Sequence, residues 1–132
     1  MTTPTAQPGE HVFLIDDDSF LLDMYAIKFK QCGLNVNAMS DPAAALDKLR
    51  KGETPSIILV DIIMPQMTGF DFLEAVQKEG LAKGAKLIVL SNQGQQEDID
   101  KAMKLGAIGY IIKASAIPSE VCEKALQIAH GK

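Results

Sequence analysis

Apolar residues form five short runs along the chain, separated by longer stretches with a different spacing. These runs cover residues 12–15, 34–39, 57–60, 87–90 and 110–112. Most are continuously apolar, which is typical of strands in a parallel sheet that is covered on both faces. The run at 34–39 alternates apolar and polar residues, so we expect it at an edge of the sheet.

The stretches between the runs carry apolar residues at helical spacing. In the first of them, Leu22, Tyr25, Phe29 and Cys32 fall on one face, and Gly33 follows as a C-cap. The second predicted helix opens with Asp41–Pro42 and the third with the capping pattern of Thr68 and Asp71. The fourth begins near Gln95 and the fifth near Pro118. Strict alternation of strand and helix predicts an α/β fold with right-handed crossovers and helices on both faces of the sheet.

Composition agrees with one globular domain. The chain has 132 residues, of which 47% are hydrophobic and 23% charged. Its net charge is −4. An acidic domain without a basic patch is not expected to bind nucleic acid directly or to sit on an anionic membrane. No apolar run approaches the length of a transmembrane helix.

The two cysteines do not suggest a disulfide framework or a zinc site. Cys32 and Cys122 are 90 residues apart and belong to no CxxC motif. We expect two small buried apolar residues in a reducing, cytoplasmic compartment. Residues 1–10 lack a signal-peptide pattern and carry two prolines, so we expect a disordered tail before a domain at 11–132.

Polar residues that can do chemistry follow four of the predicted strands. Asp16, Asp17 and Asp18 follow the first, Asp61 the third, Ser91 the fourth and Lys113 the fifth. In a doubly wound sheet, ligands bind at the carboxyl ends of the strands. Each residue alone suits a helix cap, a turn or a solvated strand end. Three acids and a lysine at one edge are harder to explain in that way.

Electrostatics suggest what such a cluster would bind. Two carboxylates about 4 Å apart repel each other by roughly 4 kcal/mol at an effective dielectric constant near 20, so a counter-ion or a proton is needed. Oxygen ligands with open positions suit Mg²⁺, which also binds phosphate. The cluster therefore predicts a phosphoryl-transfer site.

The motifs in this order resemble the receiver domains of two-component response regulators, of the chemotaxis-regulator-like, single-domain type. The resemblance covers about residues 11–130 and implies a flavodoxin-like sheet of order 2-1-3-4-5 with five helices. The acidic pair of the family matches Asp16 and Asp17, and its phosphorylated aspartate matches Asp61, which precedes Met64–Pro65. Its remaining site residues match Ser91, Tyr110 and Lys113.

The resemblance implies a specific chemistry. Asp61 would take a phosphoryl group from a sensor histidine kinase or a phosphotransfer protein. Mg²⁺ would be held by Asp17, Asp61 and the backbone carbonyl of Ile63, and Asp16 would act through a water. Lys113 would stabilise the transferring oxygens. The domain would then catalyse only its own phosphorylation and slow autodephosphorylation, so we do not expect a true enzyme.

The resemblance also implies a switch. Phosphate on Asp61 would offer Ser91 a new acceptor, and Tyr110 would follow the loop inward. The fourth helix, fifth strand and fifth helix would form the docking face for a downstream protein target. The domain would act as a monomer or as a phosphorylation-dependent dimer.

Three departures from the family pattern surround the site. Ala114 follows Lys113 where the family often has a cis proline, and a non-proline cis bond costs about 2.5–4 kcal/mol, so we expect a trans peptide. Asn92 stands where a small residue is usual, and its side chain would gate phosphate access. Ile63 and Gln93 occupy variable positions that would tune access to the site.

Alternative functions stay open at this point. The chain ends shortly after the last predicted helix, which favours a stand-alone domain over a receiver excised from a transcription regulator or a hybrid kinase. A phosphate-independent binding module would keep the receiver fold and bind a partner without being phosphorylated. A hydrolase with an Asp-x-Asp nucleophile, formally present in residues 16–18, would leave Asp61 unexplained.

Overall fold

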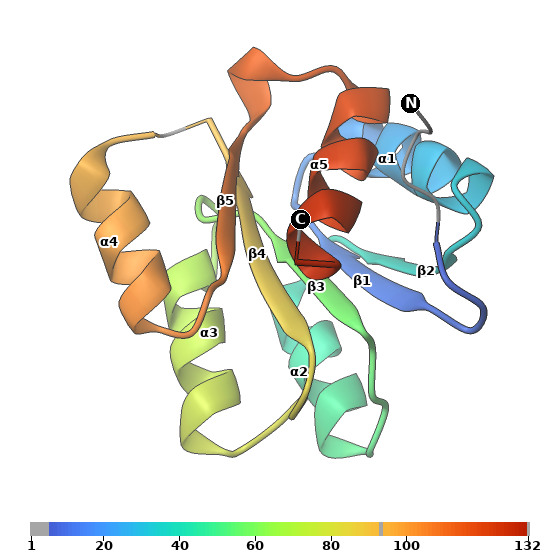
Figure 1. Ribbon diagram of the computed structural model, residues 1–132. Coiled ribbons are helices and arrows are strands. Elements are labelled where there is room, and N and C mark those ends of the chain that lie inside the picture. The colour runs from blue at the N-terminus through green and yellow to red at the C-terminus, as the bar shows by residue number, and fades with distance from the viewer. Residues whose placement is uncertain (1–5, 93, 132) are drawn as a thin grey trace.

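A parallel five-stranded sheet forms the centre of the molecule in the computed structural model, which describes residues 6–92 and 94–131. The strands are β1 (His11–Ile15), β2 (Asn35–Met39), β3 (Ile57–Val60), β4 (Lys86–Ser91) and β5 (Gly109–Ile112). Their order is β2-β1-β3-β4-β5 (Figure 1), which confirms the predicted flavodoxin-like topology.

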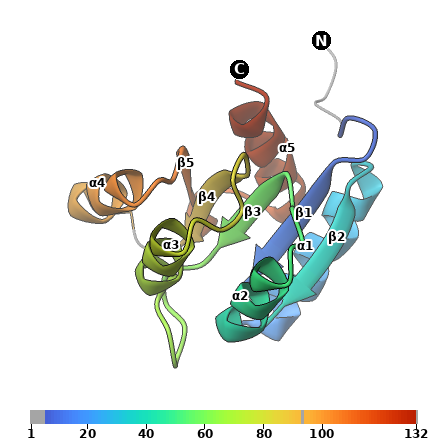
Figure 2. The ribbon, with the colours of Figure 1, turned by 90° about the horizontal axis from the view of Figure 1, so that it is seen from below.

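Five α-helices cover the two faces of this sheet (Figure 2). They are α1 (Ser19–Gln31), α2 (Pro42–Arg50), α3 (Gly69–Lys78), α4 (Gln96–Lys104) and α5 (Pro118–Ala129). Helices α1 and α5 pack on one face, and α2, α3 and α4 pack on the other. A short 3-10 helix, η1 (Lys113–Ser115), connects β5 to α5 and was not predicted.

The strand sequences explain this layering. Alternate residues of a strand point to opposite faces, so Phe13 and Ile15 enter the core under α2 and α3, while Val12 and Leu14 enter the core under α1 and α5. All four residues of β3 are buried, as expected for a central strand. Strand β2 is mostly half-buried or exposed, which confirms the edge position predicted from its alternating pattern.

Side-chain caps set the helix starts at the carboxyl edge of the sheet. The Asp18 carboxylate accepts the Leu21 N–H at 3.1 Å and so begins α1. Asp41 caps α2 in the same way. Thr68 and Asp71 form a capping box at the start of α3. At the other end of α1, Cys32 is the C-cap residue rather than a member of the helix, because the helix ends at Gln31.

The amino-terminal residues that the structure describes contact the domain. The Ala6 N–H donates to the Cys32 carbonyl at 3.0 Å. The Glu10 carboxylate lies 3.0 Å from His130 Nε2, just beyond α5. Residues 1–5 of the predicted tail lie outside the described residues, so the disordered tail and the domain boundary at residue 11 stay predictions. Among the described helices, none is long and apolar enough to cross a bilayer.

The loop from β3 to α3 turns back closely on the end of β3. The Gly69 N–H donates to the Ile62 carbonyl at 2.8 Å, which brings the start of α3 against the backbone of Asp61. A Cβ atom at residue 69 would overlap the Asp61 carbonyl oxygen and crowd Ile62 Cα. The absence of a side chain at Gly69 therefore lets α3 begin directly behind Asp61.

We predict that Gly69→Ala destabilises the domain by about 1–3 kcal/mol, since the added methyl group meets backbone atoms that cannot move aside cheaply. Urea unfolding would measure the loss. Glu74→Ala, at an exposed position of the same helix, is the control and should change the free energy of unfolding by less than about 0.5 kcal/mol. If both substitutions changed the free energy of unfolding equally, the close approach at Gly69 would not limit the residue at this position, and the prediction would be wrong.

Candidate functional site

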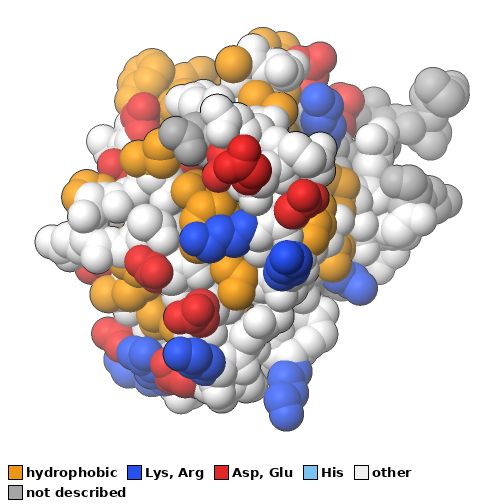
Figure 3. Space-filling model, turned by 90° about the vertical axis from the view of Figure 1, so that its left-hand side faces the viewer, with side chains coloured by type: hydrophobic (Ala, Val, Ile, Leu, Met, Phe, Trp, Pro, Cys, Tyr) orange, Lys and Arg blue, Asp and Glu red, His pale blue; other side chains and the backbone are white. Residues whose placement is uncertain are grey.

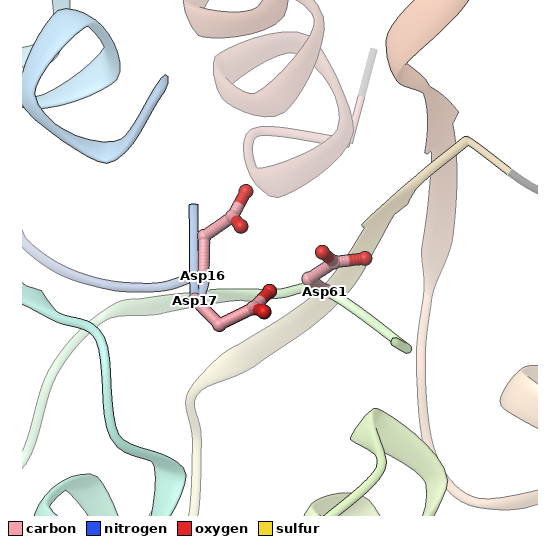
Figure 4. A group of neighbouring side chains, drawn as sticks. All are labelled: Asp16, Asp17 and Asp61. Carbon is pink, nitrogen blue, oxygen red and sulfur yellow. The ribbon is translucent and has the colours of Figure 1, made fainter. Parts of the chain in front are cut away.

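Three acidic side chains meet at the carboxyl edge of the sheet. Asp16 and Asp17 follow β1 and Asp61 follows β3, its neighbour in the sheet. Figure 4 shows their carboxylates projecting from the ends of the two strands toward a common space. One oxygen from each side chain lies within 4.8 Å of those of the other two. Asp16 and Asp61 are buried and Asp17 is exposed, so the cluster opens to solvent on one side.

Backbone and lysine contacts hold the Asp61 carboxylate in place. Asp61 Oδ1 accepts the Ile62 N–H at 2.7 Å, and the Ile63 N–H is 3.4 Å from the same oxygen. Lys113 Nζ donates to Asp61 Oδ2 at 3.0 Å. Both oxygens therefore have partners, and the carboxylate is oriented before any ligand arrives.

Lys113 also pairs with the second buried acid. Its Nζ lies 2.7 Å from Asp16 Oδ2, and only 7% of its side chain is exposed. Asp16 Oδ2 is fully buried, and among the described residues the Lys113 ammonium is its close partner. Asp16 Oδ1 accepts the Asp18 N–H at 3.0 Å. One lysine thus faces two buried carboxylates, and the site carries excess negative charge.

Burial and charge pull the protonation of these groups in opposite directions. Burial raises the pKa of Asp61, and the charge of Asp16 adds to the rise, while Lys113 works against it. Burial acts to lower the pKa of Lys113, but the neighbouring carboxylates outweigh it and hold that pKa above its ordinary value. Lys113 therefore stays protonated, and the charged form of Asp61 is less favourable here than it would be in water.

A hollow of about 270 Å³ opens above Asp61. Its lining combines the acids, the lysine and residues from the ends of β3 and β4: Asp17, Asp18, Leu21, Asp61, Ile63, Ser91, Asn92 and Lys113. Ser91 is fully buried and is the last residue of β4 rather than the first after it. The hollow gives small anions access to Asp61 from solvent.

Ser91 and Tyr110 lie on adjacent strands and interact. Burial raises the pKa of the Tyr110 hydroxyl, and a side-chain hydrogen bond with Ser91 partly lowers it. Tyr110 pairs with Val89 in the register of β4 and β5, and Ser91 pairs with Ile112. The two residues singled out as a switch pair are therefore in contact, with Tyr110 half-buried.

The residues expected to tune access surround the opening. Ile63 is 55% exposed and lines the hollow together with Asn92. Ala114 is exposed in η1, and the described residues include no cis peptide, so the Lys113–Ala114 bond is trans. Gln93 lies outside the described residues. The influence of these side chains on phosphate access stays a prediction.

Two further residues, Asp18 and Tyr25, lie beside the acidic cluster, and the family resemblance assigned neither of them a role in the site. Asp18 caps α1 and donates its N–H to Asp16, so it helps to orient that carboxylate. Tyr25 is buried on α1, and its pKa is raised by burial and responds to the charges of Lys113 and Asp16. The position of Asp18 directly before a helical pattern signalled a cap. For Tyr25, the sequence pattern predicted only a core residue on the apolar face of the first helix.

We predict that Asp61→Asn stabilises the protein without added metal by about 1 kcal/mol near neutral pH, because it removes one of two buried like charges. The folded-state pKa of Asp61 is raised, so the native state binds its proton more tightly than the unfolded chain does. The charged form thus destabilises the fold as pH rises above the ordinary aspartate range. Urea unfolding of both proteins should show a stability gap that shrinks toward acid pH; a gap independent of pH would contradict this account.

Comparison with known proteins agrees with this geometry. Residues 12–125 match the family model described as the response regulator receiver domain. The chemotaxis protein CheY of Thermotoga maritima is 32% identical over 115 residues, with 87% of this chain and 93% of that protein covered. The transcriptional regulatory protein SphR of Synechococcus elongatus, described as acting in alkaline phosphatase synthesis, is 25% identical over 118 residues. That match covers 83% of this chain but only 45% of SphR.

Solved structures share the fold over almost all of the chain. A CheY-like receiver domain protein from Methanospirillum hungatei has a TM-score of 0.82 at 25% identity, covering 93% of this chain and 95% of that one. CheY4 of Vibrio cholerae also has a TM-score of 0.82 at 25% identity, covering 91% of this chain and 98% of that one. The chain belongs to the receiver domain family of the two-component response regulators and is a phosphoacceptor signalling module.

Proposed function

We propose that Asp61 is the phosphoacceptor and that it takes its phosphoryl group from a phosphohistidine of a sensor histidine kinase or a phosphotransfer protein. The observation that carries this proposal is the position of Asp61 at the floor of the hollow, with Lys113 at 3.0 Å and two more carboxylates beside it. Asp61 combines access from solvent with fixed orientation of both oxygens.

In the transfer step, a carboxylate oxygen of Asp61 attacks the phosphorus atom and forms an acyl phosphate. The bond from phosphorus to the histidine nitrogen breaks, and its electron pair stays on the imidazole. The chain contributes mainly positioning and charge, as is general for phosphoryl transfer. Hydrolysis of the acyl phosphate by water in the same hollow would return the domain to its starting state slowly, without turnover of an external substrate.

The acidic cluster fits a divalent cation. Three carboxylates with one lysine leave an excess of negative charge, and the exposed Asp17 leaves the cluster open to solvent. Hard oxygen ligands of this kind suit Mg²⁺, which keeps several waters and shares its shell with phosphate. When held by Asp17, Asp61 and the Ile63 carbonyl, with Asp16 acting through a water, Mg²⁺ would offset the repulsion between the Asp61 carboxylate and the incoming phosphoryl oxygens.

Lys113 supplies the fixed positive charge on the opposite side. Its side chain is almost fully buried, and its raised pKa keeps it protonated. A preoriented charge in a site of low water content stabilises developing negative charge more strongly than the same charge in water. In this proposal Lys113 exchanges part of its contact with Asp61 for contact with the phosphoryl oxygens.

Ser91 and Tyr110 would carry the signal to the surface. Ser91 lies at the wall of the hollow and is hydrogen-bonded with Tyr110 on the neighbouring strand. A phosphoryl group on Asp61 would give the Ser91 hydroxyl a charged acceptor. A change at Ser91 would therefore act on Tyr110 and on the start of α4.

The surface next to Tyr110 is suited to a protein partner. Figure 3 shows the side of the molecule formed by α4, where hydrophobic side chains lie between acidic and basic ones. Met103 on α4 is 40% exposed, and Ile108 before β5 is 47% exposed. A half-buried groove beside Tyr110 continues along β5 to Lys124 and Gln127 of α5. We propose this α4–β5–α5 face as the docking surface for a downstream protein, or for a second copy of the domain after phosphorylation.

Intact-mass measurement with acetyl phosphate tests the chemistry. We expect one added phosphoryl group on the wild type in the presence of Mg²⁺, and none without a divalent cation or in Asp61→Ala. Asp41→Ala, which removes an exposed helix cap at the same sheet edge but outside the hollow, should accept phosphate like the wild type. Phosphate on Asp61→Ala, or no adduct on the wild type, would overturn the proposal; in the second case a phosphate-independent binding module becomes the better account.

The switch is tested separately by Ser91→Ala. We expect this variant to be phosphorylated on Asp61, but the change in amide NMR shifts that phosphorylation causes should stay near the hollow instead of reaching α4 and β5. Ser40→Ala, at an exposed position of the same sheet edge, should respond like the wild type. If Ser91→Ala transmitted the same shifts to α4 and β5 as the wild type, Ser91 would not be the link.

A further inference from the structure

Helices α1 and α5 pack against each other on one face of the sheet (Figure 1). This packing brings the two cysteines together. Cys32 is the C-cap residue of α1, and Cys122 lies within α5. Their Sγ atoms are 2.7 Å apart, although the residues are separated by 90 positions in the chain. Neither cysteine belongs to the acidic cluster or lines the hollow above Asp61, and neither has a part in the phosphoryl chemistry proposed above.

The distance between the two Sγ atoms is longer than a covalent S–S bond and shorter than an ordinary van der Waals contact. A disulfide bond is about 2.04 Å long, and non-bonded heavy atoms pack best at about 3.5–4.0 Å. At 2.7 Å, bond formation needs a relative shift of less than 1 Å. We propose that Cys32 and Cys122 are a redox modification site, in which a hydroperoxide converts the two thiols into a reversible disulfide between α1 and α5.

The two cysteines differ in access, which assigns them different roles. Cys122 is fully buried among Val121, Ala125 and Leu126, whereas Cys32 is half-buried at the end of α1. Burial raises the pKa of the Cys122 thiol, so it stays protonated. Cys32 is therefore the thiol that meets the oxidant, and Cys122 is the resolving thiol beside it.

The reaction balances with hydrogen peroxide as oxidant. The Cys32 sulfur attacks one peroxide oxygen, the O–O bond breaks, and the other oxygen leaves with the thiol proton as water. The product is a sulfenic acid on Cys32. The Cys122 sulfur then attacks the Cys32 sulfur, the S–O bond breaks, and the hydroxide leaves with the Cys122 proton as a second water. Two thiols are oxidised, and one peroxide is reduced to two waters.

The local backbone allows the small movement that the bond requires. Cys122 is held inside α5, but Cys32 stands where α1 ends and is followed by Gly33 with a φ of +97°. The chain at Gly33 is thus at a turn and not in a regular element. The cross-link would tie the carboxyl end of α1 to α5, which is also one wall of the groove beside Tyr110.

Intact mass and thiol counting test the proposal on the wild-type chain. After treatment with hydrogen peroxide, unfolding and alkylation with N-ethylmaleimide, we expect a protein lighter by two hydrogen atoms that carries no label. Dithiothreitol before alkylation should restore two labels. Tryptic peptides 31–48 and 114–124 should appear as one linked species without reductant.

Single variants identify the role of each sulfur. Cys122→Ala should accumulate a sulfenic acid on Cys32 that dimedone traps. In Cys32→Ala, the Cys122 thiol should stay reduced and alkylatable under the same conditions. The proposal is overturned if the wild type keeps two alkylatable thiols, gains oxygen without the cross-link, or forms only disulfide-linked dimers. Because the wild type alone gives these outcomes, the test stands even if a variant folds poorly.

Discussion

The contact of one buried lysine with two buried carboxylates is the constraint on which the carboxyl edge of this domain depends. Lys113 reaches Asp16 at 2.7 Å and Asp61 at 3.0 Å. Each charge would be costly to bury alone, and removal of one partner from a buried ion pair is more destabilising than the pair is stabilising. The lysine does not balance the cluster, because Asp17 adds a third carboxylate. The remaining negative charge is what makes the site receptive to a cation.

The fold serves this contact by bringing three distant segments to one edge. Because all strands are parallel, the residues after β1, β3 and β5 emerge on the same side of the sheet. The close turn at Gly69 places the start of α3 behind Asp61, and the Asp18 cap fixes the start of α1 beside Asp16. The apolar strands thus determine where the charges lie, and the caps determine how they are oriented.

The strands and helices could be predicted because their signals are local: apolar runs, helical spacing and capping residues. The sheet order came from the resemblance to the receiver family. The sequence also indicated Asp16, Asp61 and Lys113 as neighbours, since each follows a strand of a parallel sheet. Contacts that depend on how elements pack could not be predicted in this way. The approach of Cys32 to Cys122 depends on how α1 lies against α5, and a separation of 90 residues gave no sign of it. The helix η1 was missed because three residues are too short to show periodicity.

The hydrogen bond between Ser91 and Tyr110 changes how the proposed switch would work. A serine hydroxyl has one donor hydrogen and two acceptor lone pairs, so it can donate to a phosphoryl oxygen and accept from the Tyr110 hydroxyl at the same time. With the Tyr110 hydroxyl as donor, this bond would persist when Asp61 is phosphorylated. Hydrogen bonds in such a chain polarise and strengthen one another.

A charged hydrogen bond contributes about 1.5–3 kcal/mol, whereas moving an equilibrium from 1:99 to 99:1 takes about 5.5 kcal/mol. In the proposed switch, the existing Ser91–Tyr110 contact would reduce the free-energy change that phosphate must drive, because Tyr110 already lies within hydrogen-bond reach of Ser91. A partner bound at the α4–β5–α5 face would supply the rest of the free energy needed to shift the equilibrium.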